Sequence, residues 1–149
     1  MTNDRPSDSG AAADRDRAAP APDAPALRPP YVLVVDDNAT NLELAVFTLE
    51  IEGFEVGTAR DADEFRRVFA ARRPDAVLMD VQLPGTSGLE LTRALKADPA
   101  TRDIPVIAVT AYAMRGDEER MRAAGCDGYL SKPLDVNVFA AQVRGLLPR

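Results

Sequence analysis

The sequence predicts an α/β fold in which five parallel strands form one open, doubly wound sheet with helices on both faces. From residue 31 onward, short runs rich in Val, Ile and Leu alternate with longer amphipathic stretches. The runs lack the polar alternation of half-exposed strands, which is typical of parallel strands covered on both sides. Five strand–helix units with right-handed crossovers then produce three layers, with helices outside and the sheet between them.

Residues 1–30 differ in composition from the rest of the chain, and we predict a disordered tail there. They hold eight alanines and six prolines, and Leu27 is the only large aliphatic residue besides Met1. Such a segment buries too little apolar surface to offset the entropy cost of ordering it. We therefore divide the chain into an Ala/Pro-rich tail, residues 1–30, and one domain, residues 31–149. A passive tail is the simplest interpretation, since no motif indicates docking or localisation.

The five strands and five helices are predicted from apolar spacing and from start signals. The expected strands are Tyr31–Val35, Phe54–Thr58, Ala76–Met79, Val106–Val109 and Gly128–Leu130. The expected capping pairs of the first three helices are Thr40–Glu43, Asp61–Glu64 and Ser87–Glu90. The expected core positions are Leu42, Ala45, Val46 and Leu49, then Phe65, Val68 and Phe69, then Leu91, Ala94 and Leu95, and finally Phe139, Val143 and Leu146.

The last two helices are predicted less sharply. The fourth is expected from near Asp117 to just before Gly125, behind a loop of residues 114–116, and the fifth from about Asp135 to Leu146. Gly125 is a plausible glycine for the position that follows a helix.

Composition excludes several classes of function. The chain has 149 residues and a net charge of −6 without a basic stripe, which argues against general binding to nucleic acid. It has neither an apolar stretch long enough for a membrane helix nor the apolar core of a secretory signal, so we expect a cytoplasmic protein. Because the chain has no histidine, it lacks a Ser–His or Cys–His pair, a histidine-ligated metal and a phosphohistidine carrier. Cys126 is the single cysteine, so no internal disulfide forms.

Acids, a hydroxyl and a lysine stand at the ends of four predicted strands. Asp36 and Asp37 close YVLVVDD, Asp80 closes AVLMD, Thr110 closes VIAVT, and Lys132 follows DGYLS. Ligands of open α/β sheets bind beyond the carboxyl ends of the strands, where all of these residues fall. Burying carboxylates side by side is costly unless they share a cation. The arrangement therefore indicates a divalent-metal site, with Mg²⁺ favoured and Mn²⁺ as an alternative.

This site suits the transfer of a phosphoryl group to a carboxylate, as a mixed anhydride. We expect Asp37 and Asp80 to be direct metal ligands and Asp36 to act through water. Lys132 supplies a fixed positive charge, and Thr110 offers a hydroxyl from the third side. Asp36 and Asp37 taken alone fit the cap of the following helix equally well, and the matching strand ends favour the metal site.

The pattern resembles the receiver domain of bacterial response regulators. An Asp-Asp pair, an Asp followed by LPG, Thr-Ala and Lys-Pro occur in that family's order and spacing, over residues 31–147. The segment AYAMRGDEERMRAAGCDGYLSKPLD, together with DNATNLEL, is most similar to single-domain regulators of the DivK type and to receivers of hybrid kinases. The resemblance implies a CheY-like (βα)5 fold of the flavodoxin type. It also implies that Asp80 is the phosphoacceptor, and that Asp36, Asp37 and the backbone carbonyl of Gln82 serve Mg²⁺.

The resemblance also implies a conformational switch. Thr110 turns toward the phosphoryl group, Lys132 pairs with it, and Tyr129 moves inward, with Lys132–Pro133 as a cis peptide. The fourth helix, the fifth strand and the fifth helix form the face that partners read. Gln82 and Tyr112, two residues beyond Asp80 and Thr110, are expected to tune hydrolysis, although ordinary surface residues fit those positions as well. Cys126 is interpreted as a packing residue rather than a redox sensor.

We therefore expect a stand-alone response regulator of a two-component system or phosphorelay. The donor is a sensor histidine kinase or a histidine phosphotransfer protein, the output is a protein contact, and no separate substrate, nucleic acid or membrane is involved. Two alternatives stay open: an adaptor that signals without phosphorylation, and a phosphate sink. A hydrolase is disfavoured because Gln82 and Asn38 stand where a second acid is needed. A nucleotide-binding protein is disfavoured because both glycine-rich phosphate-binding motifs are absent.

Overall fold

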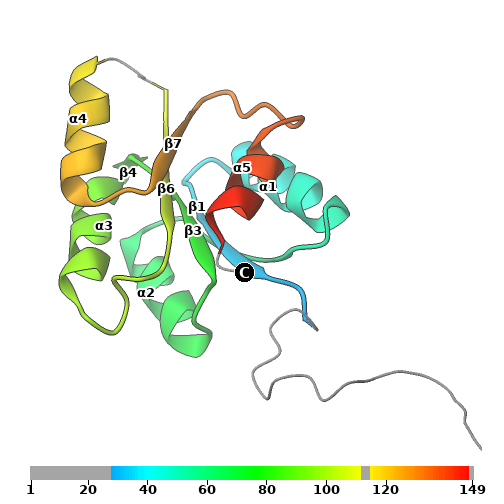
Figure 1. Ribbon diagram of the computed structural model, residues 1–149, viewed down its shortest axis with the longest axis horizontal. Coiled ribbons are helices and arrows are strands. Elements are labelled where there is room, and N and C mark those ends of the chain that lie inside the picture. Colours follow the sequence, from blue (N-terminus) through cyan, green and yellow to red (C-terminus); the bar gives the residue numbers. More distant parts are fainter. Residues whose placement is uncertain (1–27, 112–114, 148–149) are drawn as a thin grey trace, which may run out of the picture.

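The computed structural model describes residues 28–111 and 115–147, and it has the expected doubly wound fold (Figure 1). The main sheet has the strand order β2-β1-β3-β6-β7, and every pair is parallel. Its strands are β1 Tyr31–Val35, β2 Glu55–Ala59, β3 Ala76–Asp80, β6 Val106–Thr110 and β7 Gly128–Ser131. The helices are α1 Ala39–Ile51, α2 Ala62–Ala71, α3 Gly88–Ala97, α4 Arg115–Ala124 and α5 Phe139–Leu146.

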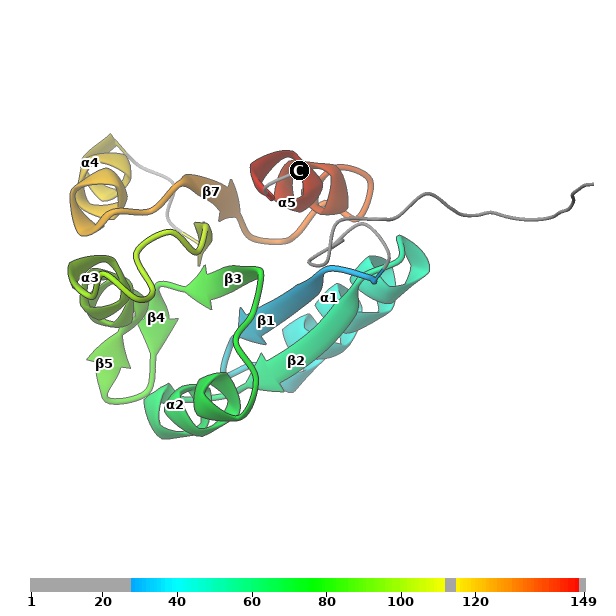
Figure 2. The ribbon, with the colours of Figure 1, turned by 60° about the horizontal axis from the view of Figure 1, so that its bottom comes forward.

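Two apolar cores separate the layers. On one face of the sheet, α1 and α5 pack against alternate residues of the strands, including Val32, Leu78 and Ile107. On the other face, α2 and α3 pack against the intervening residues, such as Leu33 and Met79, and α4 extends this layer beside α3. Figure 2 shows the two helical layers on opposite sides of the strands. Because both faces are covered, β1, β3 and β6 are buried along their whole length.

The predicted strands match the observed ones with small shifts at their ends. Strand β2 begins at Glu55 rather than Phe54, because the amide of Phe54 donates to the carbonyl of Leu49 and so still belongs to the end of α1. Gly53, between the two, has φ of +94°, a conformation that favours glycine. A small antiparallel hairpin follows β3, formed by β4 Gln82–Leu83 and β5 Thr86–Ser87, and the sequence pattern does not predict it.

The predicted caps of α2 and α3 are confirmed, whereas the predicted starts of α1, α4 and α5 are wrong. Asp61 caps α2 by accepting from the amide of Glu64 (2.8 Å). Ser87 caps α3 by accepting from the amide of Leu89 (3.1 Å), but its expected partner in the capping box forms an ion pair with Arg93 instead.

At α1 the predicted cap is wrong. Asn38, not Thr40, caps α1 through the amide of Asn41 (3.0 Å). Asn38 precedes Thr40 in the chain, and its backbone is held in the extended conformation of a cap because its own amide donates to Asp36 (2.9 Å).

Two further predictions about helices are corrected by the structure. Helix α5 begins at Phe139, since Asp135 instead closes a turn that accepts from the amides of Asn137, Val138 and Phe139. In α3, Ala94 is exposed and Thr92 is fully buried, because the Thr92 hydroxyl donates to the carbonyl of Gly88 (3.0 Å) and loses its need for water.

Helix α4 starts two residues earlier than predicted, so residues 115 and 116 are helical rather than part of a loop, and residue 114 lies outside the described residues. It ends as expected before Gly125, which has φ of +102°. In residues 28–111 and 115–147, no helix is long and apolar enough to cross a membrane.

Phe139 tests the core between α5 and the sheet. Its side chain is fully buried, so we expect Phe139→Ala to lower the free energy of unfolding by about 3–5 kcal/mol, measured by urea denaturation. Phe47→Ala is the matched control, because Phe47 is 64% exposed and its loss is expected to change stability by no more than about 0.5 kcal/mol. Equal losses in the two variants would contradict this packing.

Candidate phosphoryl-acceptor site

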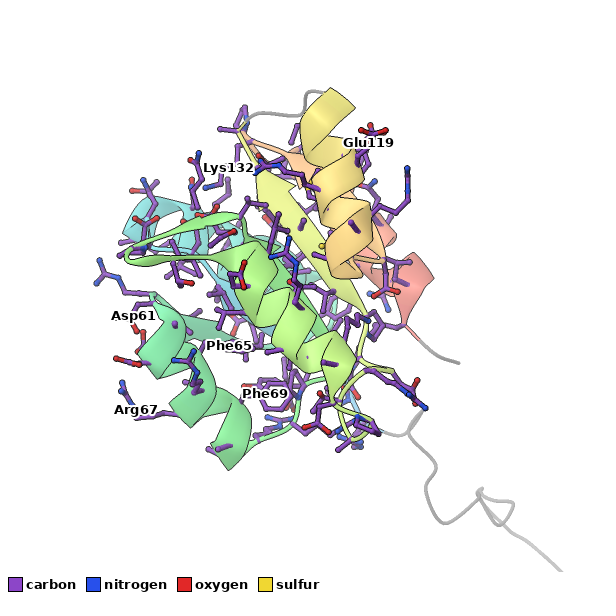
Figure 3. All side chains as sticks on the ribbon, turned by 90° about the vertical axis from the view of Figure 1, so that its left-hand side faces the viewer. Asp61, Phe65, Arg67, Phe69, Glu119 and Lys132 are labelled. Carbon is purple, nitrogen blue, oxygen red and sulfur yellow. The ribbon has the colours of Figure 1, made fainter. Side chains whose placement is uncertain are left out.

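Four strand ends bring the predicted site residues to one edge of the sheet. Asp36 and Asp37 follow β1, Asp80 ends β3, Thr110 ends β6, and Lys132 follows β7. Because β1, β3, β6 and β7 are neighbours and parallel, their carboxyl ends lie side by side. Figure 3 labels Lys132 at this edge of the molecule, far from Phe69 in the opposite part of the fold.

Lys132 joins two of the acids. Its ammonium group lies 3.0 Å from Oδ2 of Asp80 and 3.3 Å from Oδ2 of Asp36. The backbone of Lys132 is fixed as well, because its amide donates to the carbonyl of Thr110 (2.8 Å). The bond between Lys132 and Pro133 is cis, as expected. A lysine that spans two strand ends in this way holds both carboxylates at a defined separation.

Asp36 is buried and is held by the start of α1. Its Oδ1 accepts from the amide of Asn38 (2.9 Å), and its Oδ2 accepts from the side-chain amide of Asn41 (3.3 Å). The sequence analysis missed Asn41. Its role could have been predicted from its position five residues after Asp36, which places the Asn41 side chain on the first turn of α1 beside the acid.

Asp80 lies at the centre of the site and is only 2% exposed. Its Oδ1 accepts from the amide of Gln82 (3.0 Å), and its Oδ2 faces Lys132. Burial raises the pKa of Asp80 above its ordinary value, against the opposing effects of the bonds from Lys132 and Gln82, and the nearby charge of Asp36 adds to the rise. Burial alone would lower the pKa of Lys132, but the hydrogen bond and charge of Asp80, together with Asp36, outweigh burial and raise it.

The three aspartates form a cluster that fits a hard cation. Carboxylate oxygens of Asp36, Asp37 and Asp80 all lie within 4.8 Å of one another, and Asp37 is open to solvent while the other two are buried. Lys132 supplies one positive charge against three carboxylates. An all-oxygen site with one open side is the kind that Mg²⁺ prefers, because this ion keeps several of its waters.

The match to known families agrees with this geometry. The model of the response regulator receiver domain matches residues 32–144, which is most of the chain. The chain belongs to the response regulator receiver family. It is 46% identical over 119 residues to the polar-differentiation response regulator DivK of Brucella anthropi, covering 80% of this chain and 97% of that protein. DivK of Brucella ovis is 46% identical over 116 residues, covering 78% of this chain and 94% of that protein.

Solved receiver structures have the same fold. A putative response regulator from Chloroflexus aurantiacus has a TM-score of 0.77 and 30% identity, covering 82% of this chain and all of that one. The receiver domain of a sensor histidine kinase from Pseudomonas aeruginosa has a TM-score of 0.68 and 35% identity, covering 79% of this chain and 94% of that one. That structure contains a magnesium ion coordinated in its active site cleft.

The remaining predicted residues of this receiver domain lie in different settings. Thr110 is buried, 3% exposed, at the end of β6. The side chain of Gln82 is exposed beside Asp80, and Tyr112 lies outside the described residues. Tyr129 is 38% exposed and its hydroxyl donates to Glu118 of α4, a bond that raises the pKa of the phenol. In this conformation Tyr129 therefore points outward.

Gly88 brings the start of α3 against the backbone of Asp80. A Cβ at this position would lie 2.0 Å from the carbonyl oxygen of Asp80, so no side chain fits without displacing α3 or β3. The amide of Gly88 also donates to the carbonyl of Val81 (2.8 Å). The sequence analysis did not single out this glycine, although it stands directly after the cap at Ser87.

We expect Gly88→Ala to lower the free energy of unfolding by about 1–3 kcal/mol, because the added methyl group overpacks the contact between α3 and β3. Gly145→Ala is the control, since nothing lies within 4 Å of its Cβ position, and alanine in helix α5 is expected to add about 0.5–1 kcal/mol. Urea denaturation measures the free energy of unfolding of both variants, which we expect to fall in Gly88→Ala and to rise in Gly145→Ala. Stabilisation by Gly88→Ala would contradict the close approach.

Cys126 is half-buried behind α4, and burial raises the pKa of its thiol above the ordinary value. The thiolate is the reactive form, so it appears at higher pH here than in an exposed cysteine. We expect iodoacetamide to modify Cys126 more slowly in the folded chain than in the same chain unfolded in urea, with the ratio of the two rates greatest at pH values well below the ordinary pKa of a thiol, which include neutral pH, and smaller in alkaline solution. Mass spectrometry over a pH series measures both rates, and equal rates near pH 7 would contradict the prediction.

Proposed function

We propose that this receiver domain cycles between a free and a phosphorylated form of Asp80, with a phosphohistidine as the donor. The observation that carries the proposal is the position of Lys132, whose ammonium group bridges Asp80 and Asp36 at the open edge of the sheet. The donor is a sensor histidine kinase or a histidine phosphotransfer protein, and the reaction takes place in the cytoplasm.

In the proposed reaction, a carboxylate oxygen of Asp80 attacks the phosphorus of the phosphohistidine. A phosphorus–oxygen bond forms, the phosphorus–nitrogen bond breaks, and the imidazole leaves with the electron pair. The hydrogen bond from the Gln82 amide and the ion pair with Lys132 fix the orientation of the carboxylate, so that the attack starts from a defined geometry.

Asp36, Asp37, Asp80 and the carbonyl of Gln82 would hold Mg²⁺, or Mn²⁺ in its place, which supplies positive charge to the phosphoryl oxygens when bound. The observation in favour is the cluster of carboxylate oxygens within 4.8 Å. Lys132 supplies a second positive charge that does not depend on the metal. Its bond to Asp36 holds it in place while its partner at Asp80 changes from a carboxylate to an acyl phosphate.

We further propose that phosphorylation changes the face made by α4, β7 and α5. The phosphoryl group draws the hydroxyl of Thr110 toward it, and Tyr129 then leaves Glu118 and fills the vacated space. Its present outward position and its bond to Glu118 support the assignment of this conformation to the unphosphorylated state. The output is a contact with a protein target on this face. Gln82 and Tyr112 tune the rate at which water removes the phosphoryl group.

We expect Asp80→Asn to abolish phosphoryl uptake completely, because an amide cannot form the acyl phosphate. Intact mass after incubation with acetyl phosphate and Mg²⁺ measures uptake, and EDTA is expected to suppress it in the unaltered chain. Asp63→Asn is the matched control, since the side chain of Asp63 is 87% exposed on α2, and we expect this variant to take up the phosphoryl group as the unaltered chain does.

Uptake by Asp80→Asn at the same level would show that another residue is the acceptor. An unaltered chain that takes up nothing, from acetyl phosphate or from a phosphorylated histidine kinase, would instead favour an adaptor that works without phosphorylation.

A further inference from the structure

The outer side of α1 exposes a stripe of large apolar side chains. Leu44, Phe47 and Ile51 are 37%, 64% and 65% exposed, and their spacing places them on one side of the helix. Helices of globular proteins usually turn such residues inward. No element in the described part of the chain covers this stripe.

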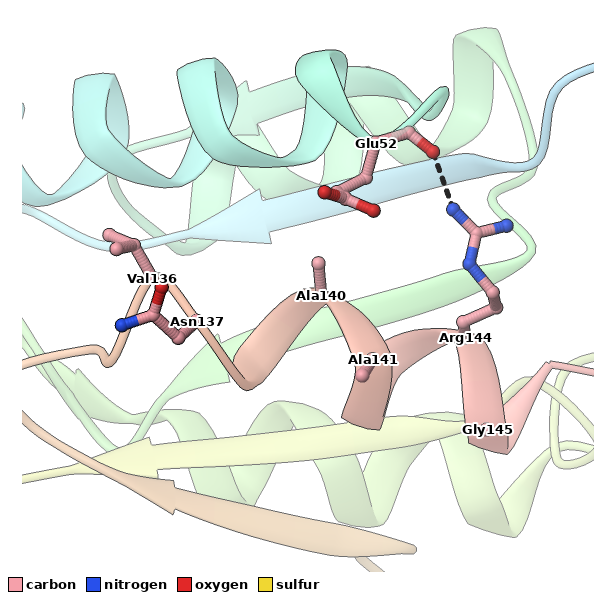
Figure 4. Close-up of a pocket in the computed structure, with 7 residues that line it drawn as sticks. All are labelled: Glu52, Val136, Asn137, Ala140, Ala141, Arg144 and Gly145. Carbon is pink, nitrogen blue, oxygen red and sulfur yellow. Dashed lines mark hydrogen bonds between the residues drawn. The ribbon is translucent and has the colours of Figure 1, made fainter.

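Two hollows flank α1, and Phe47 of the stripe lines one of them. One, of about 280 Å³, lies between the end of α1 and α5 and is lined by Val136, Ala140 and Arg144 among others. Figure 4 shows it, with the side chain of Arg144 donating to the carbonyl of Glu52 at its rim. The other, of about 510 Å³, lies between α1 and β2, where Val46, Phe47 and Thr58 contribute to its lining. An extended segment laid along α1 therefore has depressions to fill on either side.

The charge on α1 limits what can cover it. Residues 39–52 contain Glu43, Glu50 and Glu52 and no lysine or arginine. Neither Glu43 nor Glu50 forms an ion pair with another residue in the described ranges. A second copy of the chain that offered its own α1 would set acids against acids, which disfavours a symmetric dimer through this helix. The surface fits an apolar occupant that does not bring a surplus of acids.

The chain itself has such a segment, attached beside the stripe. The carbonyl of Pro30 accepts from the amide of Glu55 (2.9 Å), and the amide of Phe54 donates to Leu49 in the last turn of α1 (3.0 Å). The residues before Pro30 therefore join the fold close to the end of α1 that carries Ile51. A proline-rich chain extends roughly 3.1 Å per residue, so residues 18–27 reach about 30 Å, whereas the stripe from Leu44 to Ile51 is only about 10 Å long.

The composition of this segment matches the surface. Residues 18–27 contain five alanines, three prolines, Leu27 and one acid, Asp23, and the two arginines before them alternate with Asp14 and Asp16, so the segment is nearly neutral. A proline-rich segment loses little entropy on docking, because its extended conformation is already favoured. We propose that residues 18–27 dock along the outer side of α1, with the Ala/Pro stretch on Phe47 and Ile51. A partner that uses this side of α1 must then displace the chain's own N-terminal segment.

Paramagnetic broadening tests the contact in the full chain. A nitroxide is attached at Ala21→Cys in a Cys126→Ser background, and amide peaks are recorded with the label oxidised and reduced. We expect residues 44–51 to lose at least half of their peak intensity. The double variant Phe47→Ser, Ile51→Ser is expected to abolish most of this loss, and both side chains are exposed enough to be replaced without unfolding the domain.

Arg66→Ser, Arg67→Ser is the matched control, because it changes two exposed residues of α2 on the opposite face of the sheet and is expected to leave the broadening unchanged. Broadening of residues 44–51 that survives the α1 double variant would overturn the proposal, as would an absence of broadening. A mixture of nitroxide-labelled chain with ¹⁵N chain that carries no nitroxide distinguishes contacts within one molecule from contacts between two. Broadening of the ¹⁵N peaks in that mixture would show that the segment docks on another molecule instead.

Discussion

The ammonium group of Lys132 between two buried carboxylates is the interaction on which the site depends. Asp36 and Asp80 lie on neighbouring strands and repel each other, and removing water from them costs still more free energy. Lys132 follows β7 at the edge of the sheet, and its positive charge partly offsets the two carboxylates. Its amide donates to the carbonyl of Thr110 at the end of β6, which lies between β3 and β7. Through its side chain and its backbone amide, one residue thus connects the ends of β1, β3, β6 and β7 at the edge where the chemistry is proposed.

The sheet and its charged edge could be predicted because both follow from strong local patterns. Buried parallel strands require apolar residues on both faces, so runs such as that ending at Asp80 stand out without knowledge of the partners. Once the strands are parallel, their carboxyl ends must meet, and the approach of Lys132 to Asp36 and Asp80 follows from topology. The assignments of Gln82 and Tyr112 as tuning residues stay predictions, since they depend on contacts with a phosphoryl group.

Three of the wrong predictions concern polar residues whose hydrogen-bond partners the sequence pattern does not reveal. Thr40 and Asn38 both suit a helix cap, and the choice falls to Asn38 because Asp36 holds its backbone. Asp135 has the right type for a cap but closes a turn four residues before α5 begins. Ala94 was placed in the core by spacing alone, while the burial of Thr92 depends on a hydrogen bond along the helix that no apolar pattern reveals.

The hydrogen bond from Tyr129 to Glu118 has an optical consequence. The chain contains no tryptophan and three tyrosines, so its intrinsic ultraviolet emission comes from tyrosine alone. A carboxylate that accepts a hydrogen bond from a phenol quenches that phenol's fluorescence, and Tyr129 is held in this way between β7 and α4. The separation of these two groups changes the emitted light without any attached dye. Tyr129 is thus an intrinsic fluorophore at the contact between α4 and β7.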